Sequence, residues 1–174
     1  MNGNEKMNEK DKSAFQDLCI KHKATGSKFI DSKSIVIGYW PRYKCQYGCP
    51  AYNKSLCCPP NCPTPDETKK IVSDYTLGLL VHFSGDVGIT KAIVKIEREI
   101  FLENYYKVIG FGAGPCRLCK ECSKTECEFP QLARPSMEGC GIDVYATARN
   151  NGFSINVLKT KNEEKNCYGL LLIE

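Results

Sequence analysis

The chain contains 174 residues, of which 12 are cysteine, and its 24 Lys and Arg exceed its 20 Asp and Glu to give a formal charge of +4. Its longest apolar runs are far shorter than the ~18–20 residues of a membrane-spanning helix, and residues 1–12 contain no apolar targeting region. These features predict a cytoplasmic protein without a membrane partner, in which the cysteines are metal ligands, redox groups or buried thiols rather than a disulfide framework.

The first third of the chain is expected to hold a helix, a strand and a long loop. Residues 1–12 are polar and have no periodic apolar face, which predicts a disordered tail ahead of one domain over residues 13–174. Apolar residues at helical spacing predict a helix from Ser13, and the β-branched run at residues 34–39 predicts a strand that Pro41 ends. Residues 41–65 have no period and contain five cysteines, so we expect a long loop that is held by a ligand.

The middle of the chain is predicted to alternate between helices and strands. Thr64, Pro65 and Glu67 form a capping-box sequence, which predicts a helix that runs to about Tyr75. The nearly continuous apolar run at residues 77–83 predicts a strand that is covered on both faces. Apolar residues at helical spacing then predict the longest helix over residues 90–107. A short strand is predicted to follow it at residues 108–111.

The last third is expected to complete a layered fold. A helix is predicted within residues 135–150, and strands are predicted at residues 153–159 and 168–173, which should pair antiparallel across a short link. The alternation predicts an α/β fold with a mixed central sheet of about four to five strands, helices on its faces and two cysteine-rich metal-binding loops.

The stronger cysteine signal is the run C-x2-C-x2-C-x4-C formed by Cys116, Cys119, Cys122 and Cys127. Three cysteines at steps of three can wrap a loop around one 4Fe-4S cubane, and the bacterial ferredoxin spacing is C-x2-C-x2-C-x3-C-P. The fourth cysteine departs by one residue, so Cys140 competes with it as fourth ligand. A single zinc is the alternative, although structural zinc sites more often use two separated C-x2-C pairs.

The second signal lies in residues 45–62 and is less diagnostic. Adjacent side chains of an extended chain point to opposite sides, so Cys57 and Cys58 are not expected to bind one cluster together. The two prolines after Cys58 fix the backbone there and make that residue the better ligand. The resulting four-thiolate site consists of Cys45, Cys49, Cys58 and Cys62, and a buried cysteine-rich patch without metal is the alternative.

Three stretches of the chain resemble the predicted metal-binding proteins catalogued as domain of unknown function 2284. They are YKCQYGCPAYNKSLCCPPNCPTPDET (residues 43–68), GAGPCRLCKEC (residues 112–122) and ARPSMEGCGIDVYATARNNGF (residues 133–153). The resemblance implies a prokaryotic, anaerobe-associated cytosolic protein with iron-sulfur clusters, and it assigns no reaction. Cys57 and Cys62 depart from the family pattern, which leaves open a first site with three cysteines and one open iron, or one that borrows Cys140.

These observations give one expected function and two alternatives. The first is an iron-sulfur protein with one or two 4Fe-4S clusters that passes electrons to a redox partner protein in anaerobic metabolism. The alternatives are an iron-sulfur enzyme whose open cluster iron acts on a small substrate, and a zinc-binding interaction module. No basic run alternates with aromatic residues, so nucleic acid is not expected as a partner, and the sequence leaves the oligomeric state open.

Overall fold

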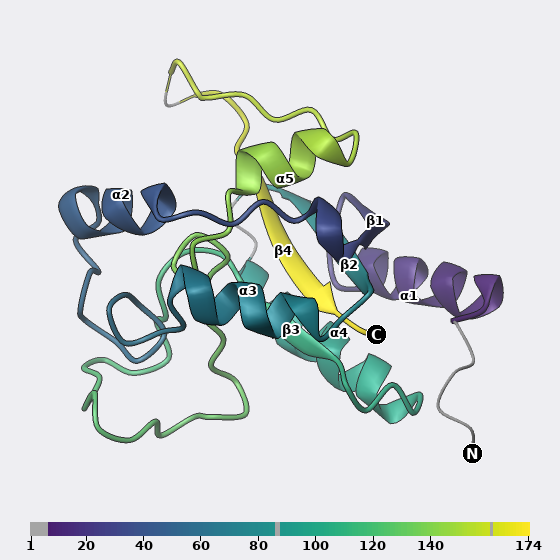
Figure 1. Ribbon diagram of the computed structural model, residues 1–174, viewed down its shortest axis with the longest axis horizontal. Helices are drawn as coiled ribbons and strands as arrows, with labels where there is room; N and C mark the ends of the chain where they lie inside the picture. The colour runs from purple at the N-terminus through teal and green to yellow at the C-terminus, as the bar shows by residue number, and fades with distance from the viewer. Residues whose placement is uncertain (1–6, 86–87, 161) are drawn as a thin grey trace.

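A four-stranded antiparallel sheet forms the centre of the computed structural model, which describes residues 7–85, 88–160 and 162–174 (Figure 1). The strands lie in the order β1-β2-β4-β3, and their bounds are Gly26–Asp31 (β1), Leu77–Ser84 (β2), Ile109–Phe111 (β3) and Asn166–Leu172 (β4). Every neighbouring pair is antiparallel. The prediction of a mixed sheet is therefore wrong, because β4 pairs with β2 and β3, whereas residues 153–158 form no strand.

Helices cover both faces of this sheet, so the fold is α/β. The helices α1 (Glu9–Lys21) and α4 (Ile89–Leu102) pack on one face, and α3 (Pro65–Ser73) and α5 (Val144–Asn150) pack on the other. Alternate residues of β2 point to opposite faces of the sheet. Leu79 and Val81 pack in the core beneath α1 and α4, and Leu80 packs in the core beneath α3 and α5. This double cover explains the nearly continuous apolar run of β2.

Several elements confirm the sequence predictions, and the start of α3 does so in detail. The Thr64 hydroxyl accepts a hydrogen bond from the Glu67 N–H at 3.2 Å, while the Glu67 carboxylate accepts one from the Thr64 N–H at 2.7 Å. The strands β2 and β3 and the helix α5 occupy the predicted positions, and α4 ends at Leu102 rather than Lys107. The reciprocal cap satisfies two backbone donors that would otherwise lack a partner.

The N-terminal third differs from the predictions at two places. The helix α1 begins at Glu9 rather than Ser13, because the Asn8 side chain accepts a hydrogen bond from the Asp11 N–H at 2.9 Å. Residues 1–6 of the expected tail lie outside the described residues. The strand predicted at residues 34–39 is wrong, since this stretch follows a 3-10 turn, η1 (Ser32–Ser34), and forms one isolated bridge within the described chain.

One strand has no counterpart among the predictions, and the predicted role of Pro41 is wrong. The edge strand β1 was missed, since its sequence, GSKFID, is half polar and borders solvent on one side. Pro41 was read as the end of a strand but lies in the first turn of α2 (Trp40–Gly48), where its missing N–H has no intrahelical partner to lose. The expected loop therefore starts after Gly48 instead of at Pro41.

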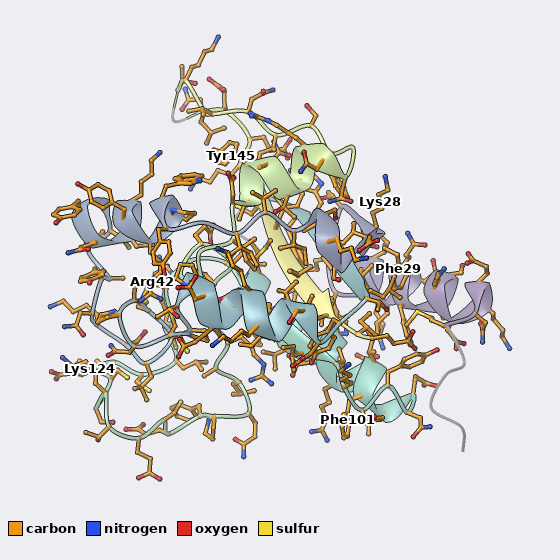
Figure 2. All side chains as sticks on the ribbon, viewed as in Figure 1. Lys28, Phe29, Arg42, Phe101, Lys124 and Tyr145 are labelled. Atoms are coloured by element: carbon orange, nitrogen blue, oxygen red, sulfur yellow. The ribbon has the colours of Figure 1, made fainter. Side chains whose placement is uncertain are left out.

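The helix α2 and the two cysteine-rich loops lie at the opposite end of the molecule from α1 (Figure 1). Figure 2 labels two residues at this end, Arg42 of α2 and Lys124 of the second cysteine-rich loop. None of the helices in the described ranges combines the length and apolar character that crossing a bilayer requires.

Candidate metal centre

Residues 45–140 contain ten cysteines, which we call the loop cysteines, and eight of them line two cavities. The adjacent residues Cys57 and Cys58 line one cavity each. The larger cavity has a volume of about 300 Å³, and we call it the five-cysteine cavity after Cys57, Cys116, Cys119, Cys122 and Cys127. The smaller has a volume of about 200 Å³, and we call it the three-cysteine cavity after Cys45, Cys49 and Cys58. All eight residues carry free thiols. Both volumes far exceed the ~10–15 Å³ that one water requires, so each cavity has room for a group larger than a single ion.

The three-cysteine cavity is built by the end of α2 and a tight turn of the first loop. Cys45 and Cys49 lie four residues apart at the C-terminus of α2, where the Cys49 N–H donates to the Cys45 carbonyl at 3.2 Å. This spacing places both thiols on one side of the helix end. Cys58 comes from a turn in which its N–H donates to the Ser55 carbonyl at 3.2 Å and its carbonyl accepts from the Asn61 N–H at 2.9 Å.

A carboxylate that the sequence analysis did not consider, Glu138, also lines the three-cysteine cavity. Its Oε2 atom is buried and has no hydrogen-bond partner among the described residues. Burial raises the pKa of this carboxyl, although its own backbone N–H and the Ser136 hydroxyl oppose the change. No spacing motif in the sequence points to Glu138, which reaches the cavity because residues 135–137 are bound to Gly112 by two backbone hydrogen bonds of 2.8 and 3.0 Å.

The five-cysteine cavity joins the whole second cysteine run to Cys57 of the first loop. Burial, followed by the charge of Cys116 and a hydrogen bond with it, raises the pKa of Cys57 to about 12. In the other cavity, burial and the charge of Cys49 raise the pKa of Cys45 to about 11. The thiols of Cys57 and Cys45 therefore stay protonated at neutral pH until a cation stabilises their thiolates.

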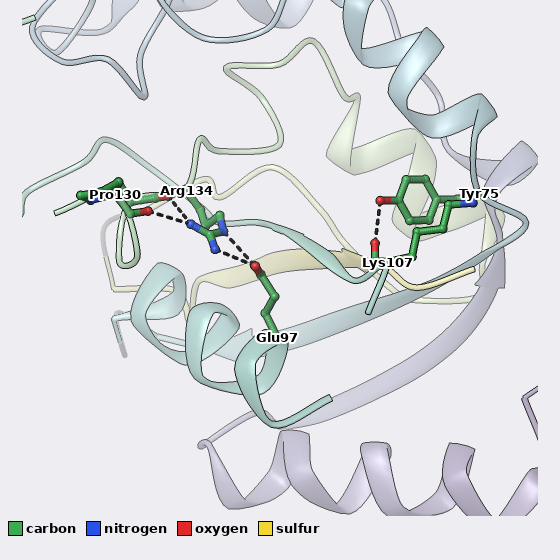
Figure 3. Close-up of polar contacts among 6 residues, drawn as sticks. Tyr75, Glu97, Lys107, Pro130 and Arg134 are labelled. Carbon is green, nitrogen blue, oxygen red and sulfur yellow. Dashed lines mark hydrogen bonds and ion pairs between the residues drawn. The ribbon is translucent and has the colours of Figure 1, made fainter. Parts of the chain in front are cut away.

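The second cysteine loop is anchored to α4 by a two-point ion pair (Figure 3). Arg134 Nε and Nη2 donate to the two carboxylate oxygens of Glu97 at 2.8 and 2.6 Å, and Nη1 donates to the Pro130 carbonyl at 3.2 Å. The charge of Arg134 is therefore matched by that of Glu97. The pair fixes the end of the loop relative to the sheet.

Cys62 and Cys140 lie outside both cavities and contact each other. Cys62 Sγ is 3.2 Å from the Gly139 carbonyl oxygen, and both residues are buried. A hydrogen bond from Cys140, together with the charge of Arg42, lowers the pKa of Cys62, while the same bond and burial raise the pKa of Cys140. The structure thus places seven of the nine predicted ligands in the two cavities, each with its own sequence neighbours, and adds Cys57 to the five-cysteine cavity. Cys62 and Cys140, the latter predicted to compete with Cys127 as fourth ligand, lie outside both cavities.

Arg42 of α2 joins the three segments that surround this buried pair. Its Nη1 donates to the carbonyls of Pro63 at 2.7 Å, Cys62 at 3.1 Å and Gly139 at 3.4 Å. A guanidinium can satisfy several carbonyls at once, so Arg42 supplies hydrogen bonds that loop segments without strands cannot make with each other. It is a second residue that cysteine spacing alone could not identify.

Within the described parts of the chain, no three His, Cys, Asp or Glu side chains converge closely enough to hold a single metal ion. A tetrahedral zinc needs its sulfur ligands at about 2.3 Å from one point, whereas a cubane takes each thiolate on a different iron and holds the sulfurs farther apart.

One of three comparisons with known proteins found a match, and it indicates metal binding without specifying the metal. No curated protein and no solved structure matched the chain. The family model described as predicted metal-binding protein (DUF2284) matches residues 28–173, which include both cavities and all ten loop cysteines. The chain therefore belongs to the DUF2284 family of predicted metal-binding proteins.

Proposed function

We propose that this protein is a cytoplasmic iron-sulfur protein in which each cavity holds one 4Fe-4S cluster, and that it transfers single electrons to a redox partner protein in anaerobic metabolism. The observation that carries the proposal is the distribution of eight free thiols over two adjoining cavities. A cubane supplies one-electron redox chemistry at a potential set by hydrogen bonds, net charge and solvent exposure around it.

The ligands follow from the lining of each cavity. Cys116, Cys119 and Cys122 would each bind one iron of the cluster in the five-cysteine cavity, and Cys127 and Cys57 both lie within that cavity to serve the fourth. Cys45, Cys49 and Cys58 would bind three irons of the other cluster. Cys62 and Cys140 would support the loops from their buried contact instead of binding iron.

Iron-sulfur clusters are favoured over zinc by the space between the thiols. Both cavities are larger than one ion requires, and the thiols do not converge on one point among the described residues. A zinc-binding interaction module would require the loops to contract around each ion.

A second candidate function is favoured by the smaller number of thiols in the three-cysteine cavity. Three thiolates leave one iron of a cubane without a cysteine ligand, and an open position on a metal is where a small substrate can bind. The protein would then be an iron-sulfur enzyme, with the five-cysteine cluster as its electron supply.

Anaerobic purification followed by iron, sulfide and zinc analysis tests the proposal. We expect four iron and four sulfide for each of the two cubanes, and reduction should produce two cluster signals in electron paramagnetic resonance (EPR) spectra. The Cys58→Ser variant should weaken one signal, while Cys19→Ala, which removes a buried thiol of α1 outside both cavities, should change neither. Stoichiometric zinc without sulfide would overturn the proposal.

A further inference from the structure

The wall of the three-cysteine cavity contains a carboxylate where a fourth thiolate would be expected. Among the residues that line this cavity, Glu138 is the one with an acidic side chain, and it stands with Cys45, Cys49 and Cys58. We propose that the Glu138 carboxylate is the fourth ligand of this centre and binds the iron that the three thiolates leave open. This inference rests on the proposed function, because it requires a cluster in the cavity.

The first support is the unsatisfied oxygen. Glu138 Oε2 is buried and has no hydrogen-bond partner among the described residues, although most buried polar atoms in proteins have one. Removing a carboxylate oxygen from water without a partner is strongly unfavourable. A metal cation in the cavity would supply the missing interaction, and carboxylate oxygen is a normal ligand for iron.

The second support is the rigid turn that carries Glu138. The Cys140 N–H donates to the Ser136 carbonyl at 3.2 Å, and the Gly139 N–H donates to the Ser136 hydroxyl at 3.0 Å. Met137, which precedes Glu138, and Cys140, two residues after it, are fully buried in the core of the α3 and α5 layer. The backbone of the turn is therefore fixed by its buried neighbours and holds the Cα of Glu138 at the cavity wall.

Charge and coordination number support the same assignment. An ionised carboxylate adds the same negative charge to the cluster as the thiolate it replaces, so the centre would keep the net charge of an ordinary four-cysteine cubane. Oxygen binds this iron less strongly than sulfur does, because cluster iron prefers soft thiolate ligands. The iron on Glu138 is thus the one most easily lost, and the centre is chemically distinct from its neighbour.

The test compares Glu138→Gln, Glu138→Cys and the control Glu103→Gln, which changes an exposed glutamate at the end of α4. Each holoprotein is purified anaerobically, analysed for iron and sulfide, and treated with ferricyanide as one-electron oxidant. Loss of the weakly held iron follows [4Fe-4S]2+ → [3Fe-4S]+ + Fe2+ + e−, with the electron reducing ferricyanide, and the product has a characteristic EPR signal.

We expect Glu138→Gln to lose one iron per chain with its sulfide retained, and to show the three-iron signal in full. Glu138→Cys should keep this iron and resist ferricyanide at least tenfold longer than the natural protein, and Glu103→Gln should match the natural protein. If Glu138→Gln loses the whole centre, retention of all iron by Glu138→Cys supports the assignment, and loss in both variants overturns it.

Two outcomes separate this inference from the proposed function. Full iron content and an unchanged Mössbauer spectrum in Glu138→Gln would overturn Glu138 as a ligand while the two clusters remain. Absence of iron and sulfide from the natural protein would overturn the proposed function itself.

Discussion

Replacing Arg134 with methionine should lower the free energy of unfolding by about 2–3 kcal/mol. The substitution keeps most of the side-chain volume but leaves the Glu97 carboxylate without its partner. The side chains are 24% and 12% exposed for Arg134 and Glu97. Their pair therefore lies between exposed pairs, worth ~0–1 kcal/mol, and buried pairs, in which loss of one partner costs ~3–5 kcal/mol. For a chain of this size, the corresponding fall in melting temperature is roughly 4–12 °C.

The assay is thermal and urea unfolding of the anaerobic holoprotein, followed by circular dichroism. Arg98→Met is the matched control, because Arg98 is an exposed arginine on α4, the helix that carries Glu97. Its loss should change the free energy of unfolding by less than about 0.5 kcal/mol. The double variant Arg134→Met with Glu97→Gln should recover part of the loss, since no unpaired charge remains. Equal stabilities of Arg134→Met and Arg98→Met would refute the reasoning.

Four further predictions concern the metal, the ligands, the backbone and pH. Removal of metal by an anaerobic chelator should lower the melting temperature, because thiolate coordination contributes folding free energy; equal melting of both forms would contradict this. Cys57→Ser and Cys127→Ser should each keep the cluster of the five-cysteine cavity and only the double variant should lose it, since five thiols serve four irons; iron loss in either single variant, measured by analysis and EPR, would show the spare thiol to be ineffective. Gly141→Ala should destabilise the protein by about 1–3 kcal/mol or more, because φ is +84° and a Cβ would lie 2.7 Å from a backbone oxygen. Gly114→Ala, where φ is +68° and an added Cβ meets open space, should lower the free energy of unfolding by less when both variants are compared by urea titration. Equal losses would show that the contact of the added Cβ at Gly141 contributes nothing. Hydrogen bonds from a lysine and a histidine lower the pKa of Glu99 in the folded protein, so the stability that this carboxylate contributes is present above its unfolded pKa of about 4.3 and is lost as pH falls through the folded value. Glu99→Gln should flatten this acid-side decline, and an unchanged pH profile of urea midpoints would refute it.

The parts of the fold that could be predicted are those governed by local signals. The capping box at Thr64 and the buried run of β2 needed no knowledge of distant residues. The strand β1 could not be predicted, because an edge strand that pairs on one side tolerates polar residues throughout. The wrong strand at residues 153–159 had the appropriate residue types, but the hydrogen bonds of β4 are taken by β2 and β3.

The candidate site divides in the same way. Spacing identified both cysteine segments, and the rule that neighbouring side chains of an extended chain diverge agrees with Cys57 and Cys58 lining different cavities. Spacing could not assign Cys57 to the second segment, nor detect Glu138, since both depend on how loops far apart in sequence pack together. The contacts of Arg42 with three carbonyls are likewise a product of tertiary structure.

The shared wall of the two cavities has a consequence for how charge would move through the loaded protein. Cys57 and Cys58 belong to different cavities yet are joined by a single peptide bond. Where Cys57 rather than Cys127 binds the fourth iron, a continuous covalent route of a few atoms would link one centre to the other. Under the proposed function, this route would let the two centres exchange electrons within one molecule.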